Sequence, residues 1–297
     1  MSGPLDRVSP GPERTSPRQW WPEGYLLACD GARIRYVEAG GGPPVILLHG
    51  AGGSAVGSWF SNGVAPALSA ANHVLAFDMR GHGLSGGRSH DFAGMAADAI
   101  EIMDQRGWRR AHFAGYSMGG AVMARLMAMH PDRFITASFQ GAGISEIGPW
   151  RRDMPPDETG ADPDEPHAHA IAKARRAARG QEIGNDLHGM LAGAAAALGG
   201  LRSWQALEDM LWRAMTSSPA IDLLSITFPV MAINGQFDRP IARTHRLARE
   251  LADFTNVVLP GKGHLTAMME GFIPIEYVET YASFVRRHNQ GLETWRT

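Results

Sequence analysis

Three side chains, far apart along the chain, have the types needed to cleave an acyl bond. Ser117 stands in Gly-Tyr-Ser-Met-Gly (residues 115–119), Asp238 ends Gly-Gln-Phe-Asp, and His264 follows Gly-Lys-Gly. A serine hydroxyl is a weak nucleophile at neutral pH unless a histidine takes its proton, and that histidine needs an acceptor to fix its tautomer. These residues therefore predict acyl transfer, with Ser117 as nucleophile, His264 as base and Asp238 orienting the imidazole.

The serine lies where a strand should turn into a helix. A mostly apolar stretch, residues 110–114, precedes the pentapeptide, and a helix-length stretch, residues 120–130, follows it and ends before Pro131. A tight turn of this kind lifts the hydroxyl above the sheet, and the flanking glycines let the chain close without side-chain clashes. A Gly-x-Ser-x-Gly pattern also arises by chance in a chain with 36 glycines, so the setting carries the prediction.

The candidate acid and base each follow a short apolar run. Residues 230–233 precede the Asp238 loop and residues 257–259 precede the His264 loop. Because the carboxyl ends of parallel strands meet at one edge of a sheet, we expect both side chains to converge there on the serine. Asp253 and Glu250 remain alternative acids, and His82 also follows an apolar run.

A glycine-rich loop follows the apolar run at residues 45–48, in the sequence His-Gly-Ala-Gly-Gly. Small residues let backbone N–H groups face a substrate carbonyl oxygen, which is the requirement for an oxyanion hole. We expect the donors to be the N–H groups of Met118 and Ala51, with Gly52 as the alternative to Ala51. His49 is expected to brace this loop and not to act as a base.

Short apolar runs alternate with helix-length stretches along most of the chain, which favours an α/β fold with a mostly parallel sheet covered on both faces. The expected strands are residues 33–38, 45–48, 73–77, 110–114, 135–139, 230–233 and 257–259. The expected helices are residues 59–71, 92–107, 120–130, 244–251 and 277–288.

One long segment breaks this alternation. Residues 144–225 contain no convincing strand, which predicts a helical cap inserted into a core made of residues 24–143 and 226–297. The residues expected to line a substrate pocket are Gly52 of the glycine-rich loop and, in this segment, Trp150, Met190, Trp204 and Trp212. Packing of the cap onto the core is the competing role for these apolar residues.

Composition excludes several classes of partner. The 297 residues carry 28 Lys and Arg against 30 Asp and Glu, a net charge of −2, which does not favour nucleic acid. Cys29 is the single cysteine, so no intramolecular disulfide is expected. The sequence contains no run of about 18 apolar residues, so no membrane span is expected. Residues 1–23 hold five prolines and no apolar signal core, which predicts a flexible arm and a cytoplasmic protein, with the arm a candidate contact in a homo-oligomer.

With these pieces in place, the chain resembles the α/β-hydrolase superfamily over residues 24–288, as a serine carboxylesterase-like member with a helical cap. The motifs that carry the resemblance occur in the family's order: residues 49–52, Asp-Met-Arg-Gly-His-Gly-Leu-Ser at 78–85, Gly-Tyr-Ser-Met-Gly-Gly at 115–120, residues 235–238 and Gly263-His264. The resemblance implies an eight-stranded sheet, a cap after the sixth strand and an enzyme that uses neither metal nor cofactor.

The resemblance leaves the substrate open. Ser117 argues against haloalkane dehalogenases and epoxide hydrolases, whose members use aspartate at this position. Carboxylesterases, lactonases and perhydrolase-like enzymes resemble the chain in the Arg-Gly-His-Gly turn at residues 80–83, and C–C bond hydrolases resemble it in the Ser-Met-Gly-Gly elbow. The latter usually carry Pro-Gly where Met79-Arg80-Gly81 stands, which favours a small-molecule ester. A ligand receptor on the same fold is the alternative of a different class.

Overall fold

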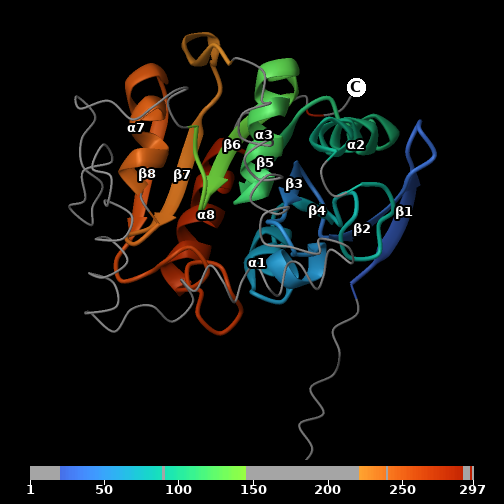
Figure 1. Cartoon of the computed structure of the whole chain (residues 1–297), viewed down its shortest axis with the longest axis horizontal. Coiled ribbons are helices and arrows are strands. Elements are labelled where there is room, and N and C mark those ends of the chain that lie inside the picture. Colours follow the sequence, from blue (N-terminus) through green and yellow to red (C-terminus); the bar gives the residue numbers. More distant parts are fainter. Residues whose placement is uncertain (1–20, 89–90, 145–220, 239, 290–294, 296–297) are drawn as a thin grey trace, which may run out of the picture.

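The computed structural model describes residues 21–88, 91–144, 221–238, 240–289 and 295. Its strands form one eight-stranded sheet in the order β1-β2-β4-β3-β5-β6-β7-β8 (Figure 1). β2 is antiparallel to both β1 and β4, and every other neighbouring pair is parallel. The strands are β1 Glu23–Leu27, β2 Arg33–Ala39, β3 Pro44–Leu48, β4 His73–Phe77, β5 Ala111–Tyr116, β6 Phe134–Gln140, β7 Val230–Gly235 and β8 Phe254–Leu259. The predicted α/β fold with a mostly parallel sheet is confirmed.

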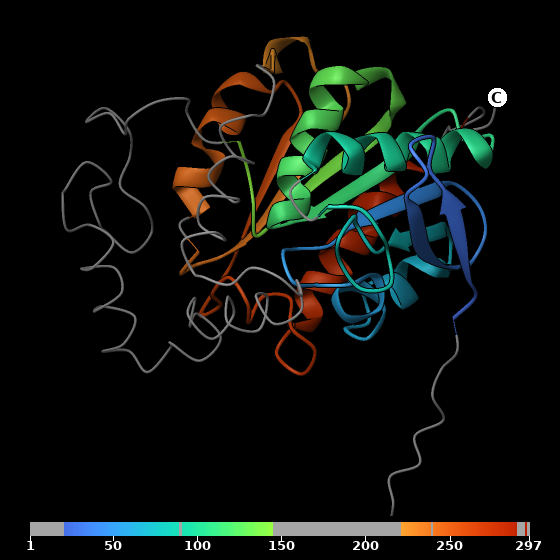
Figure 2. The same ribbon diagram turned by 45° about the vertical axis from the view of Figure 1, so that its right-hand side comes forward.

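Helices cover both faces of this sheet, because the central strands are buried on both sides. Alternate residues of β3 enter different apolar clusters: Ile46 belongs to the cluster that also holds residues of α2, α3 and α7, whereas Leu47 belongs to the cluster that holds residues of α1 and α8. Figure 2 shows the two helical layers with the sheet between them. The helices are α1 Val64–Ser69, α2 Phe92–Gln105, α3 Met118–Met129, α7 Pro240–Glu250 and α8 Ile275–His288, with short helical turns at Val56–Phe60, Pro131–Arg133 and Leu223–Ser225.

The single helix expected over residues 59–71 is interrupted. A π-type turn ends at Phe60, and α1 begins only at Val64. Gly63 between them has φ +89°, a conformation that a continuous helix cannot contain. The Asn62 side chain stabilises the interruption, because its amide donates to the Ser58 and Met268 carbonyl oxygens at 2.7 and 3.0 Å.

The first strand of the sheet was not among the expected elements. β1 pairs with β2 from Glu23 opposite Val37 to Leu27 opposite Arg33, so Cys29 lies in the turn between two strands and not before them. The flexible arm predicted over residues 1–23 is shorter than expected at its end. Trp21 already packs on the folded chain, with its ring centroid 4.9 Å from that of Phe60. The β1 segment is short and half-exposed, and it follows proline-rich residues, so its sequence carries little strand signal.

The expected cap falls largely outside the described residues, which stop at 144 and resume at 221. At the far end of that interval the side chains of Ile221 and Leu223 belong to the buried core cluster, whereas Leu224 between Leu223 and Ser225 is exposed. Within the described part of the chain, no helix combines the length and the apolar character needed to cross a membrane.

Candidate active site

The Ser117 turn connects the end of β5 to the start of α3. Ser117 has φ +51° and ψ −113°, and it is the one non-glycine residue with positive φ among the described residues. The turn is closed by backbone contacts: a Cβ added to Gly115 would lie 2.4 Å from the Gly119 oxygen, and one added to Gly119 would lie 2.2 Å from the Leu48 oxygen. Only glycine fits at either place, and the half-buried serine hydroxyl is left above the sheet.

The structure brings Ser117, His264 and Asp238 together in one line of hydrogen bonds. Ser117 Oγ lies 3.0 Å from His264 Nε2, and His264 Nδ1 lies 2.7 Å from Asp238 Oδ2. Neither alternative acid takes this place. Glu250 pairs with Arg246 and Arg249 on α7, and the exposed Asp253 lies just before β8, at the opposite end of that strand from the His264 loop.

The loops that carry the acid and the base are held against each other. Phe237 N–H donates to the Lys262 carbonyl oxygen at 2.9 Å, and the Gln236 side chain accepts from Gly261 N–H at 2.9 Å. A Cβ on Gly235 would lie 2.4 Å from the Lys262 oxygen, which shows how closely the two backbones approach. These contacts fix the separation between Asp238 and His264 independently of their own hydrogen bond.

The Asp238 carboxylate is almost completely buried yet stays ionised. Burial favours its protonated form, but the charges of Arg243 and His264 and their hydrogen bonds outweigh this, so its pKa lies below the ordinary value of 3.8. Arg243 Nη2 donates to Asp238 Oδ1 at 2.8 Å and Arg243 Nε donates to the Asp238 carbonyl oxygen at 2.8 Å. The sequence analysis did not single out Arg243, because a basic residue early in a helix has no recognisable signature.

Tyr116 is a second residue that sequence reasoning passed over, although it lies inside the pentapeptide. Its ring stacks on the His264 ring with centroids 5.2 Å apart, and its hydroxyl donates to the His264 carbonyl oxygen at 3.0 Å. Burial raises the pKa of Tyr116 well above its ordinary value, so the phenol is neutral.

The glycine-rich loop after β3 lies directly beside the serine. A Cβ on Gly50 would lie 2.9 Å from the Tyr116 ring and 3.3 Å from the Ser117 Cβ, so a side chain there would require the Tyr116 ring to move. In the backbone hydrogen bonds of the described residues, the N–H groups of Ala51 and Met118 have no acceptor. Gly52, with φ +71°, is half-buried on the same loop. Met118 is the first residue of α3, and negative charge is favoured at a helix N-terminus. The oxyanion hole formed by the Ala51 and Met118 N–H groups stays a prediction.

His49 braces this loop as expected of it. Its Nδ1 donates to the Gly50 carbonyl oxygen at 2.8 Å, and its Nε2 accepts from Met79 N–H at 2.9 Å. Burial and the neighbouring His82 lower the pKa of His49 to about 3, so the ring is neutral and both nitrogens are occupied. His82 is also buried, with Nδ1 on the Arg80 carbonyl oxygen at 2.9 Å, and the described contacts do not bring it to Ser117.

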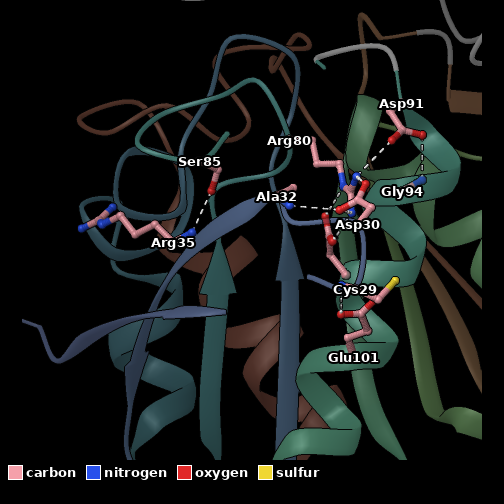
Figure 3. A network of polar contacts seen from close by, with 10 residues as sticks. Cys29, Asp30, Ala32, Arg35, Arg80, Ser85, Asp91, Gly94 and Glu101 are labelled. Atoms are coloured by element: carbon pink, nitrogen blue, oxygen red, sulfur yellow. Dashed lines mark hydrogen bonds and ion pairs between the residues drawn. The ribbon is translucent and has the colours of Figure 1, made fainter. Parts of the chain in front are cut away.

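The turn after β4, residues 78–85, is a scaffold for this loop. The buried Asp78 carboxylate accepts from Ala55 N–H at 2.7 Å and from Leu84 N–H at 3.0 Å, which joins the turn to the loop after β3. Arg80 anchors the turn from the other side through Asp98 at 2.8 Å, with Asp91 and Asp30 as further partners (Figure 3). The motif at residues 78–85 therefore has a structural role.

Of the residues expected to line a substrate pocket, Gly52 lies two residues after Gly50 on the glycine-rich loop and is half-buried. Trp150, Met190, Trp204 and Trp212 all fall within residues 145–220, outside the described residues. The pocket wall on that side stays a prediction.

Comparison with known proteins adds the family. A family model described as "alpha/beta hydrolase fold" matches residues 43–161, which include the glycine-rich loop and the Ser117 turn. The chain has the α/β-hydrolase fold. This α/β-hydrolase is 36% identical over 121 residues to the dihydrolipoyllysine-residue acetyltransferase component of the acetoin cleaving system of Pseudomonas putida. The aligned residues cover 39% of this chain and 32% of that protein. The chain thus spans about a third of the length of that relative.

Solved structures extend the similarity over the whole fold. The α/β-hydrolase superposes on an esterase, RhEst1, from Rhodococcus sp. ECU1013 with a TM-score of 0.58 and 22% identity, over 91% of this chain and 99% of the other. It superposes on a 2-hydroxy-6-oxo-6-phenylhexa-2,4-dienoate hydrolase from Rhodococcus sp. strain RHA1 with a TM-score of 0.60 and 19% identity, over 91% and 98%. Other curated relatives are named as an epoxide hydrolase, a non-heme haloperoxidase and a fluoroacetate dehalogenase. These proteins are named for different reactions, so the similarity identifies the fold that they share and not the reaction.

Proposed function

We propose that this α/β-hydrolase is an enzyme that cleaves carboxylic esters through an acyl-serine intermediate. The observation that carries the proposal is the line of hydrogen bonds from Ser117 Oγ to His264 Nε2 at 3.0 Å and from His264 Nδ1 to Asp238 Oδ2 at 2.7 Å. Because the carboxylate is ionised, it accepts from Nδ1–H, which leaves the Nε2 lone pair facing the hydroxyl. The imidazole is therefore in the tautomer that a base needs.

The reaction follows from this geometry. Ser117 Oγ attacks the ester carbonyl carbon while His264 Nε2 takes the hydroxyl proton, and the N–H groups of Met118 and Ala51 stabilise the developing oxyanion. The C–O bond to the alcohol then breaks, and His264 delivers the proton to the leaving oxygen. Water, activated by the same nitrogen, attacks the acyl-serine, releases the carboxylic acid and restores the serine.

Ester cleavage is proposed ahead of C–C bond cleavage on one residue pattern. The Ser-Met-Gly-Gly elbow suits both reactions, but Met79-Arg80-Gly81 replaces the Pro-Gly turn usual in C–C bond hydrolases. Residues 144–225 are proposed as the cap that selects the substrate, with Trp150, Met190, Trp204 and Trp212 lining it.

The test is steady-state hydrolysis of p-nitrophenyl esters from acetate to long acyl chains, by wild type and Ser117→Ala, beside a vinylogous 1,5-diketone. We expect ester turnover in the wild type and a loss of several orders of magnitude in kcat for the variant. Ester turnover that survives in Ser117→Ala would overturn the proposal. Strong diketone cleavage with feeble ester turnover would favour the C–C bond hydrolase instead. One stoichiometric burst without turnover would favour the receptor.

A further inference from the structure

The two oxygens of the Asp238 carboxylate have different partners. Oδ2 accepts from His264 Nδ1 at 2.7 Å, and Oδ1 accepts from Arg243 Nη2 at 2.8 Å. Arg243 Nε also donates to the Asp238 backbone carbonyl at 2.8 Å, so the guanidinium holds the acid at both its side chain and its main chain. The carboxylate cannot rotate without losing one of these charge-assisted hydrogen bonds.

The position of Arg243 is itself fixed by the fold. It lies on α7, five residues after Asp238, and its own side chain is one-third exposed while that of Asp238 is 7% exposed. A Cβ on Gly143 would lie 2.1 Å from the Arg243 carbonyl oxygen, so the chain after β6 packs directly on this part of α7. Asn234, at the end of β7, donates to the adjacent Ala142 carbonyl at 3.3 Å. Arg243 therefore enters the site from a fixed backbone.

We propose that Arg243 is a positioning residue of the catalytic machinery, which presents Asp238 Oδ2 to His264. The inference rests on the proposed function, because it assigns a role within the same triad. Without the guanidinium, Asp238 Oδ1 loses its Arg243 hydrogen bond in a nearly buried place. The carboxylate can then turn toward other donors, and the Nε2 lone pair loses its alignment on Ser117.

The experiment compares Arg243→Met, Arg243→Lys and Arg243→Ala with wild type, and uses Arg246→Met as the matched control. Arg246 lies one turn further along α7 and pairs with Glu250 at 3.1 Å, away from the triad. For Arg243→Met we expect kcat to fall about 10- to 100-fold with KM nearly unchanged, since a misplaced catalytic group costs this much. Arg243→Lys should recover part of the loss, and added guanidinium ion should raise the rate of Arg243→Ala but not that of an Arg246→Ala variant.

A second readout needs no substrate. The rate at which an organophosphorus fluoride modifies Ser117 depends on the same base and acid, and the downfield proton resonance of the His264–Asp238 hydrogen bond reports their geometry directly. Slower labelling and a shifted resonance in Arg243→Met, with Arg246→Met like wild type, support the inference. An unchanged labelling rate and an unchanged resonance in Arg243→Met overturn it.

These readouts separate the two proposals. If wild type is labelled but hydrolyses no ester, the ester substrate is wrong and the labelling series still decides the role of Arg243. If wild type is not labelled, the nucleophilic serine is wrong, and the proton resonance alone decides whether Arg243 positions Asp238.

Discussion

The phenol ring of Tyr116 lies nearly parallel to the imidazole of His264, with 23° between the ring planes, and its hydroxyl donates to the His264 carbonyl oxygen. Tyr116 immediately precedes Ser117, so one side chain joins the turn that carries the nucleophile to the loop that carries the base. A Cβ on Gly141, at the end of β6, would lie 2.9 Å from the same ring. The contact between nucleophile and base is thus supported by a packed aromatic residue beneath it.

This relationship predicts different outcomes for two substitutions of Tyr116. Tyr116→Phe keeps the stacked ring and loses one hydrogen bond, so unfolding free energy should fall by about 1 kcal/mol. Tyr116→Ala removes the ring and leaves a cavity under His264, which should cost about 3–5 kcal/mol. Urea unfolding followed by circular dichroism measures both, and kcat should fall far more for Ala than for Phe. Equal losses in the two variants would mean that the ring does not support the base.

The close approach between the Gly119 backbone and the end of β3 predicts that even a methyl group is excluded at residue 119. In Gly119→Ala the new Cβ would meet the Leu48 oxygen at 2.2 Å and the His49 oxygen at 2.8 Å, both on the rigid β3 backbone. We expect a loss of about 1–3 kcal/mol in unfolding free energy and a lower kcat. Gly41→Ala is the control, because no atom lies within 4 Å of its added Cβ and it should be nearly neutral. Thermal melting that ranks the two variants equally would contradict the close approach.

The backbone of Ser117 predicts that function and stability oppose each other there. Its φ of +51° with ψ of −113° disfavours any residue with a Cβ, at a cost of about 1–3 kcal/mol. Ser117→Gly and Ser117→Ala should both abolish turnover. The Gly variant should nevertheless unfold at a higher temperature than the Ala variant, because only it relieves the strain. The reverse order of melting temperatures would show that the turn is unstrained.

His112 predicts a pH dependence of stability remote from the triad. It is buried on β5, where Nδ1 accepts from the Thr136 hydroxyl at 2.9 Å and Nε2 donates to Asn289 Oδ1 at 3.0 Å. Burial lowers its pKa from 6.5 to about 3, although the Asn289 hydrogen bond opposes this. Between these values the unfolded chain binds a proton that the folded chain excludes, so stability falls as pH falls, by up to about 1.4 kcal/mol per pH unit.

The measurement is urea unfolding of wild type and His112→Gln at pH 7, 5.5 and 4. Wild type should be the more stable protein at pH 7, because its imidazole fits both partners. Its advantage should shrink toward pH 4, since the glutamine has no proton to exclude. A difference in unfolding free energy that stays constant over this range would show that His112 does not titrate with unfolding.

Much of the fold was predictable because a parallel strand buried on both faces appears in the sequence as a continuous run of apolar residues. The apolar runs at residues 45–48, 73–77 and 230–233 each became a central strand, and the residues that follow each run became the loops at one edge of the sheet. The edge strand β1 left no such record, because its side chains are mostly exposed and its pairing with β2 decides its conformation.

The residue types available for chemistry, and the order in which strand ends present Ser117, Asp238 and His264, can be read from the sequence alone. The surroundings of these three residues depend on how the chain folds. Arg243 on Asp238, Tyr116 against His264 and His49 between Gly50 and Met79 are contacts between side chains and loops that no local pattern encodes. The physical reason is that periodicity and turn residues report burial and backbone conformation along the chain, whereas a hydrogen-bond partner depends on where two separate loops meet.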